Sequence, residues 1–182
     1  MKGFVRIIGG QWKRSKLPVA DHAGLRPTPD RIRETLFNWL GQDLTGWRVL
    51  DAYAGSGALG FEAASRGAAE VVLLERDAAL VRSLAQVKDR LRAETVRVIA
   101  GDALAWLSRC APGQFDLVLI DPPFDANVFD AALAAAAPGV TDGGFLYLEA
   151  PREFDTAPAG FTLARHARAG AVHANLFRRG PG

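Results

Sequence analysis

The segment "LDAYAGSGALG", residues 50–60, joins an apolar run to a helix-forming run. Its glycines Gly55, Gly57 and Gly60 have the G-x-G-x-x-G spacing of a nucleotide-binding loop. Glycines at these positions permit a tight turn and a close approach of the backbone to a ligand. The segment therefore predicts a strand, a ligand-binding turn and a helix, which form the first unit of a Rossmann-like α/β domain.

The same alternation of apolar runs and helical patterns continues along the chain to residue 150. Unbroken apolar strands separated by helices indicate a parallel sheet that is covered on both faces. Two further β-like runs are separated only by a short turn near Gly170, which predicts a closing antiparallel hairpin. We therefore expect an α/β fold with a mostly parallel seven-stranded sheet and an antiparallel last strand. The expected strands are 48–53, 70–75, 96–101, 115–121, 143–150, 161–170 and 171–179, and the expected helices are 58–67, 77–93, 102–110 and 126–137.

The N-terminal segment has its own pattern. Residues 4–19 contain short β-like pieces broken by a glycine pair, which predicts a small hairpin. A helix is expected within residues 26–41, where Thr28 can cap, Pro29 suits the first helical position and Gly41 can end the helix. The apolar face of this helix would consist of Ile32, Leu36, Phe37 and Leu40.

Length and composition limit the classes of protein to consider. At 182 residues the chain can bury one substantial core, so we expect a basic extension at residues 1–45 and one catalytic domain at residues 46–182. No apolar run approaches the roughly 20 residues that cross a bilayer, and the N-terminus lacks the features of a signal peptide. A single cysteine, Cys110, excludes an internal disulfide, and the three histidines have no metal-ligand spacing. We expect a cytoplasmic monomer with no metal and no membrane partner.

Acidic residues near the glycine loop distinguish between two cofactors. Glu75 lies twenty residues past Gly55, where an acid would accept hydrogen bonds from a ribose of either NAD or S-adenosylmethionine. Asp51 lies four residues before Gly55 and would repel a pyrophosphate by about 1 to 4 kcal/mol at 4 Å. The ammonium and sulfonium groups of S-adenosylmethionine would instead be attracted. We therefore predict S-adenosylmethionine, with NAD-dependent oxidoreduction as a disfavoured alternative.

A further acid could contact the adenine of this cofactor. Asp102 follows the third expected strand and is suitably placed to accept a hydrogen bond from the adenine amino group, while Ala103 offers a backbone donor. Asp102 could equally cap the next helix, and the two roles are compatible. The residues expected to contact the cofactor are Asp51, Tyr53, Gly55, Gly57, Glu75, Arg76, Asp102 and Ala103.

The segment "DPPF", residues 121–124, ends the fourth expected strand at the edge where ligands bind in such sheets. Its two prolines have no N–H group, so the carboxylate of Asp121 and the carbonyl of Pro122 remain as acceptors. Two fixed acceptors suit an exocyclic amino group, Asp121 could draw off its proton, and Phe124 could stack on the base. An Asp-Pro turn that simply closes the strand is the alternative. We predict Asp121, Pro122, Pro123 and Phe124 as the catalytic segment.

Charge is distributed unevenly along the chain. Residues 1–48 have a formal charge of +5, and the remainder has −3. A basic N-terminal segment of this kind suits contacts with phosphate groups. Basic residues that only face solvent would give the same distribution of charge. The target base must leave its stack to enter a closed pocket. We expect the basic N-terminal segment to bind the rest of the RNA substrate.

These segments resemble the RsmD family, bacterial methyltransferases that modify N2 of guanine 966 in 16S ribosomal RNA. The matching segments are "RIIGGQWKRSKLPV", "LRPTPDRIRETLFNWL", "RVLDAYAGSGALGFEAASRGA", "VVLLERD" and "FDLVLIDPPF". The resemblance implies a class I S-adenosylmethionine-dependent methyltransferase that acts on ribosomal RNA, within a partly or fully assembled small subunit. It also implies that Asp121 to Phe124 hold a flipped guanine. RNA-facing residues implied in the same way are Arg6, Lys13, Arg14, Arg26, Thr28 and Arg31.

Two other functions fit parts of the sequence. An Asp-Pro-Pro-aromatic segment also serves N-methyltransferases that act on adenine or on protein glutamine, although no domain for sequence-specific DNA recognition is evident. A noncatalytic RNA-binding assembly factor could also use a methyltransferase scaffold. Such a factor predicts a damaged pocket, whereas every expected acid and glycine is present.

Overall fold

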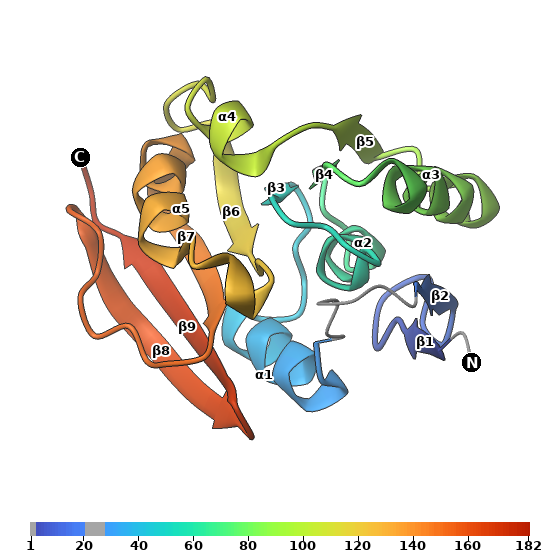
Figure 1. Cartoon of the computed structure of the whole chain (residues 1–182), viewed down its shortest axis with the longest axis horizontal. Coiled ribbons are helices and arrows are strands. Elements are labelled where there is room, and N and C mark those ends of the chain that lie inside the picture. Colours follow the sequence, from blue (N-terminus) through green and yellow to red (C-terminus); the bar gives the residue numbers. More distant parts are fainter. Residues whose placement is uncertain (1–2, 21–27) are drawn as a thin grey trace.

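A computed structural model describes residues 3–20 and 28–182 (Figure 1). It contains a large sheet flanked by helices and a separate two-stranded ribbon near the N-terminus. In the described residues no helix is long and apolar enough to cross a membrane. The strands are β1 (Gly3–Arg6), β2 (Lys16–Val19), β3 (Arg48–Asp51), β4 (Glu70–Glu75), β5 (Val96–Ala100), β6 (Phe115–Ile120), β7 (Val140–Ala150), β8 (Phe161–Ala169) and β9 (Val172–Arg179). The helices are α1 (Asp30–Leu40), α2 (Ala58–Ser65), α3 (Ala78–Leu91), α4 (Ala103–Leu107) and α5 (Phe129–Ala136), with short 3₁₀ turns η1 (Phe124–Ala126) and η2 (Ala137–Gly139).

The large sheet has seven strands in the order β5-β4-β3-β6-β7-β9-β8. Strands β5, β4, β3, β6 and β7 are parallel, and β9 runs antiparallel to both β7 and β8. The prediction of a Rossmann-like, mostly parallel sheet with an antiparallel last strand is confirmed. The strand order reverses between β3 and β6, and ligands bind at such a point, outside the carboxyl ends of the strands. Because Asp51 on β3 is paired with Leu119 on β6, Asp121 comes only two residues later, just past the end of the adjacent strand.

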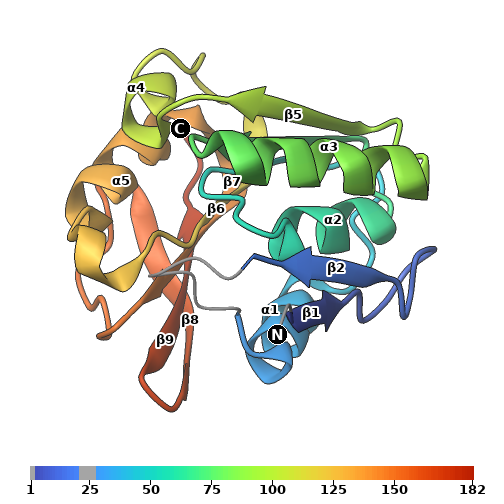
Figure 2. The same cartoon turned by 45° about the vertical axis from the view of Figure 1, so that its right-hand side comes forward.

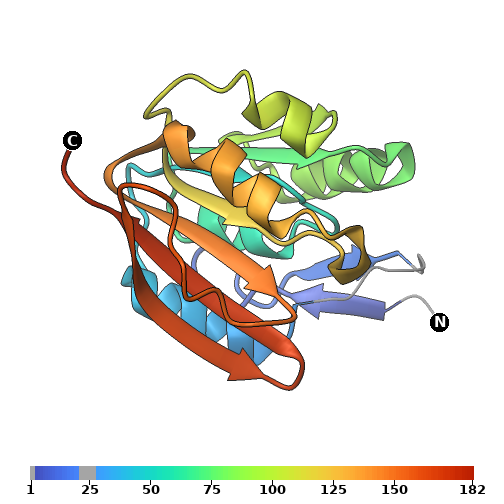
Figure 3. The same cartoon turned by 60° about the vertical axis from the view of Figure 1, so that its left-hand side comes forward.

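Alternating side chains along the strands build one core on each face of the sheet. On β3, Val49 belongs to the core beneath α1, α2 and α3, whereas Leu50 belongs to the core beneath α4 and α5. Both side chains are fully buried, as expected for a parallel strand covered on both faces. Figure 3 shows α1 and α5 on opposite sides of the sheet.

The N-terminal ribbon is docked on α2 (Figure 2). Gly10 has φ +73°, and a Cβ there would lie 1.9 Å from the carbonyl oxygen of Ser65, so only glycine permits this approach. The buried carboxylate of Glu62 accepts hydrogen bonds from the backbone N–H groups of Ile8 (2.8 Å) and Gly9 (2.9 Å). Apolar residues of the ribbon belong to the same core cluster as β3. The division of the chain at residues 45 and 46 remains a prediction.

The start of α1 differs from the sequence prediction. Pro29 is the N-cap instead of the first helical residue, and no side chain caps the helix. Thr28 is buried and directs its hydroxyl to Asp121 and Glu149. The prediction of a Thr28 cap was therefore wrong, because its single hydroxyl proton is donated to a carboxyl group of the cavity instead of the helix start. The predicted end at Gly41 is confirmed, since this residue has φ 91°.

Candidate active site

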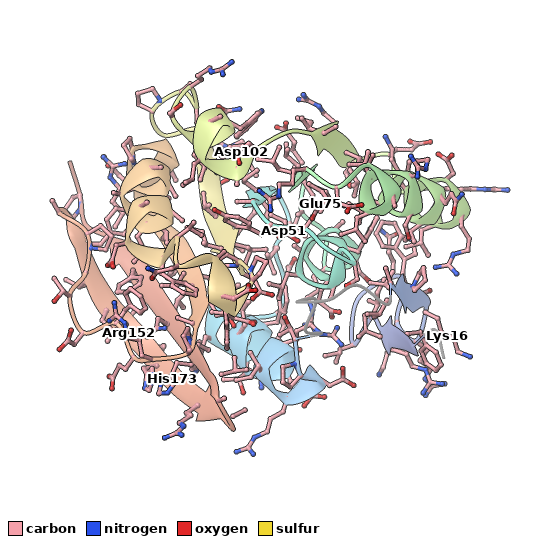
Figure 4. All side chains as sticks on the ribbon, in the orientation of Figure 1. Lys16, Asp51, Glu75, Asp102, Arg152 and His173 are labelled. Atoms are coloured by element: carbon pink, nitrogen blue, oxygen red, sulfur yellow. The ribbon has the colours of Figure 1, made fainter. Side chains whose placement is uncertain are left out.

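A cavity of about 590 Å³ lies at the carboxyl ends of the central strands. Its volume falls within the range of small-molecule and cofactor sites. Asp51 and Asp121 both line it, as does the whole segment from Asp121 to Phe124. Figure 4 shows Asp51, Glu75 and Asp102 at the ends of neighbouring strands. The expected cofactor acids and the expected catalytic acid therefore share one cavity.

The glycine loop forms one wall of the cavity. Gly57 is the N-cap of α2 with φ 82°, and a Cβ there would lie 2.5 Å from a ring carbon of Phe61. A Cβ on Gly60 would lie 2.1 Å from Leu73, so the helix packs against β4 without room for a side chain. Gly55 also has positive φ, at 55°. Each glycine thus has a local reason to be glycine, and together they leave the loop backbone open to the cavity.

The carboxyl group of Asp51 is buried with one oxygen unsatisfied. Its Oδ2 accepts a hydrogen bond from the backbone N–H of Gly60 at 3.0 Å. Its Oδ1 has no hydrogen-bond partner among the described residues. Burial, followed by repulsion from Asp121, raises the pKa of Asp51 to about 8. A buried acceptor without a hydrogen-bond partner among the described residues fits a ligand that brings positive charge.

The other expected cofactor residues surround the same space. The carboxylate of Glu75 accepts hydrogen bonds from two backbone N–H groups, those of Gly55 (2.9 Å) and Asp77 (3.0 Å).

Asp102 is exposed and caps α4 by accepting a hydrogen bond from the N–H of Ala105 at 2.9 Å, so the capping role is observed. Tyr53, Arg76 and Ala103 also line the cavity. Burial raises the pKa of the Tyr53 hydroxyl to about 12, so this hydroxyl keeps its proton at neutral pH.

The catalytic segment forms the opposite wall. Pro122 is buried and Pro123 exposed, and the chain then turns through η1. The ring of Phe124 meets Phe129 edge to face, with 6.2 Å between ring centroids. The Phe124 ring is half-buried at the cavity, and its contact with Phe129 helps to fix its position.

Two residues that the sequence analysis missed complete this wall. Glu149, near the end of β7, is 2% exposed, and Tyr147 is fully buried. Thr28 Oγ1 lies 2.9 Å from Asp121 Oδ2 and 3.3 Å from Glu149 Oε2, and the Tyr147 hydroxyl donates to Glu149 Oε1 at 2.9 Å. The polar residues Tyr147 and Glu149 within the otherwise apolar strand "FLYLEA" were the signal that could have found them.

The two carboxyl groups of this wall have shifted pKa values. Burial raises the pKa of Asp121 to about 6, and hydrogen bonds from Glu149 and Thr28 limit the increase. Burial, together with the neighbouring Asp121, raises the pKa of Glu149 well above its ordinary value. Both carboxyl groups therefore hold a proton more strongly than an exposed carboxyl group does.

The residues expected to face RNA lie mostly outside the cavity. Arg6, Lys13, Arg14 and Arg31 are exposed, whereas Thr28 lines the cavity. Arg26 lies outside the described residues.

The N-terminal ribbon also exposes the aromatic ring of Phe4. Lys16 Nζ lies 4.4 Å and Arg6 Cζ 5.2 Å from the centroid of this ring. Sequence analysis did not single out Phe4 or Lys16, because their shared face depends on strand register.

Comparisons with known proteins agree on one family. The family described as "Conserved hypothetical protein 95" matches residues 5–178. "Ribosomal RNA small subunit methyltransferase D" from Escherichia coli K12 is 40% identical over 181 residues, which cover 97% of this chain and 91% of that protein. The Haemophilus influenzae protein of the same name is 37% identical, with 97% and 95% covered. The solved structure "Putative methyltransferase yhhF" from Escherichia coli matches with a TM-score of 0.87 and 38% identity, covering 98% of this chain and 99% of that one.

Proposed function

Because the chain belongs to the RsmD family, whose shared domain is described as Conserved hypothetical protein 95, we propose that it methylates the N2 amino group of a guanine in 16S ribosomal RNA. It is a methyltransferase, and its cofactor is S-adenosylmethionine. The relatives named above are small-subunit ribosomal RNA methyltransferases, which supports the choice of RNA. The single observation that carries the choice of an amino group is the cavity shared by Asp51 and Asp121.

The residues of the glycine-loop wall fit the cofactor. Asp51 would hold its positively charged methionine part, because one buried carboxylate oxygen there is unsatisfied. Glu75, already oriented by two backbone N–H groups, would accept from the ribose hydroxyls. Asp102 and Ala103 would contact the adenine. When bound, the cofactor supplies an electrophilic methyl group, whose C–S bond breaks with its electron pair left on sulfur as the N–C bond forms.

The catalytic segment would hold the target amine and receive its proton. The Asp121 carboxylate and the Pro122 carbonyl offer two acceptors, and the N2 amino group of guanine offers two N–H donors. The amine loses one proton as its nitrogen is methylated, and Asp121 is the acceptor within reach of the cavity. Phe124 would stack on the flipped base, which is worth about 1 to 3 kcal/mol. In-line positioning of the groups contributes the larger share of the acceleration, up to about 7 to 11 kcal/mol.

The N-terminal ribbon would hold the RNA outside the cavity. Phe4 and Arg6 on β1 and Lys16 on β2 point to the same exposed face, because Arg6 is paired with Lys16 in the ribbon. An exposed aromatic ring beside two cations suits a base next to its phosphates. The exposed Lys13, Arg14 and Arg31 add phosphate contacts. Since β2 leads to Val19, which lines the cavity, this surface continues to the active site.

Methyl transfer from a radiolabelled cofactor tests the proposal. The acceptors would be small ribosomal subunits, free 16S RNA and DNA, followed by digestion to nucleosides and chromatography. We expect label in N2-methylguanosine from the subunit or its RNA. Label only in DNA, in N6-methyladenosine or in protein would assign the chain to another amino-group methyltransferase class. Absence of transfer, with intact cofactor binding, would favour a noncatalytic assembly factor.

A further inference from the structure

The catalytic wall contains two neighbouring carboxyl groups, those of Asp121 and Glu149. In residues 3–20 and 28–182, no lysine, arginine or histidine forms an ion pair with Asp121 or Glu149. Glu149 is 2% exposed and therefore has almost no access to water. Two adjacent carboxylates in such surroundings would repel each other strongly. The pair therefore needs at least one proton.

Hydrogen-bond geometry indicates where that proton lies. Tyr147 has one hydroxyl proton, which its 2.9 Å bond uses on Glu149 Oε1. Thr28 has one hydroxyl proton, and the shorter of its two contacts is with Asp121, at 2.9 Å. Asp121 and Glu149 also share a side-chain hydrogen bond, which two carboxyl groups can form only if one of them carries a proton. Because Glu149 is the more buried of the two and Asp121 already accepts from Thr28, the remaining proton of the network belongs on Glu149.

We propose that Glu149 is a positioning residue that remains protonated and donates a hydrogen bond to Asp121, so that Asp121 begins the reaction as an oriented carboxylate. This inference rests on the proposed function of Asp121 as the acceptor of the amine proton. Glu149 itself does not contact the reacting atoms. The pair holds one proton before methyl transfer and two after it, and the added proton then leaves to solvent.

The charged and titratable groups around Glu149 favour this state. Asp121 faces it from the end of β6, Tyr147 from β7, and the Thr28 hydroxyl from the segment before α1. On the neighbouring strand β9, the residue opposite Glu149 is Ala174, which brings no charge. Burial and the nearby carboxylate of Asp121 both raise the pKa of Glu149. The opposite assignment, an ionised Glu149 beside a protonated Asp121, would remove the acceptor that the amine needs.

The network also joins the N-terminal segment to the catalytic carboxyl group. Thr28 lies 93 residues before Asp121 and 121 residues before Glu149. It lies two residues before α1, which follows the basic ribbon in the chain (Figure 1). The position of Thr28 therefore orients one oxygen of Asp121, Oδ2.

Glu149→Gln tests the proton directly, because an amide keeps an acceptor for Tyr147 and a donor for Asp121 but cannot ionise. We expect its kcat to stay within about threefold of wild type, whereas Glu149→Ala loses about tenfold to a hundredfold by removing a hydrogen bond to a charged group. Wild type and Glu149→Gln should both lose activity as the pH falls below about 6, the pKa of Asp121. Only the wild type should also lose activity at high pH, where Glu149 ionises. Glu94→Gln, at an exposed acid, is the matched control.

A spectroscopic measurement separates this inference from the proposed function. The carboxylic acid C=O stretch of the wild type near pH 8, assigned by carbon-13 labelling of glutamate, should disappear in Glu149→Gln and persist in Glu94→Gln. This band does not depend on which substrate is methylated. If Glu149→Gln retains the wild-type band, or is as inactive as Glu149→Ala while folded by thermal unfolding, the inference is wrong.

Discussion

The carboxyl groups on the two walls of the cavity have different surroundings. On the glycine-loop wall, Asp51 keeps one oxygen without a partner among the described residues. On the opposite wall, Asp121 accepts a hydrogen bond from Thr28 and lies beside Glu149. Glu149 in turn accepts a hydrogen bond from Tyr147. The first arrangement leaves an open position for a positive charge. The second satisfies its carboxyl groups with hydrogen bonds and suits an acceptor for a proton.

Removal of the Asp121 carboxylate should have the largest effect. In Asp121→Ala the amine proton has no acceptor, so we expect kcat to fall by about 10² to 10⁴-fold, the usual range for a general base. Cofactor affinity, measured by calorimetry, should remain within about threefold because Asp51 and the glycine loop are untouched. Glu94→Ala serves as the control. An equal loss of cofactor binding and transfer would mean that Asp121 belongs to the binding wall.

Removal of the charge at Asp51 should affect the other wall. Asp51→Asn loses an attraction of about 1 to 4 kcal/mol toward a charge at 4 Å, which corresponds to about tenfold to a thousandfold in the Kd for S-adenosylmethionine. Calorimetry with the free protein measures this change. Binding of the variant at wild-type affinity would show that the unsatisfied oxygen of Asp51 does not face the cofactor's charge.

Ionisation of Asp51 predicts two pH dependences of opposite sign, one of protein stability and one of cofactor affinity. The pKa of Asp51 is raised from 3.8 to about 8 in the folded protein, so this group lowers the stability of the cofactor-free protein as pH rises from about 4 through about 8. Cofactor affinity should rise over the upper part of this range, because only the ionised carboxylate attracts the ligand. Asp51→Asn should remove both trends in thermal unfolding and calorimetry. A wild type and variant with parallel pH profiles would contradict the assignment.

Gly57 tests whether the loop backbone itself shapes the first wall. Gly57→Ala combines positive φ with a Cβ that lies 2.5 Å from Phe61, so we expect a loss of about 1 to 3 kcal/mol in the free energy of unfolding. Gly46→Ala is a matched control, since Gly46 has φ +85° and no atoms within 4 Å of the added Cβ. Denaturant unfolding measures both. An equal loss in the two variants would assign the whole effect to backbone conformation.

Substitutions on the outer face of the N-terminal ribbon should have the smallest effect. Phe4→Ala should weaken RNA binding by about fivefold, at the low end of base stacking because the ring is 48% exposed. Arg6→Ala should weaken it to a similar degree and reduce the salt dependence of binding by about one counterion. Filter binding over a range of salt concentrations measures both, with the exposed Arg109→Ala as control. Unchanged binding in both variants would place the RNA on another surface.

The same contrast explains how far the sequence could predict this molecule. The glycine-loop wall comes from residues close together in the chain, such as Asp51 and Gly55, so its pattern is visible as a motif. The mostly parallel sheet with its closing hairpin also followed from the alternation of apolar strands and helices. Thr28, Asp121 and Glu149 meet only after folding, across 93 and 121 residues, and no local pattern specifies that contact. Thr28 was expected to cap α1 because local geometry alone favoured that use of its hydroxyl.

Mapping of methylated nucleotides in 16S ribosomal RNA from cells that lack this protein would test the account as a whole. We predict that one guanine loses its N2-methyl group, and that the wild-type gene restores it while Asp121→Ala does not. An unchanged methylation pattern, or the loss of a methyl group from an atom other than an exocyclic nitrogen, would contradict the account.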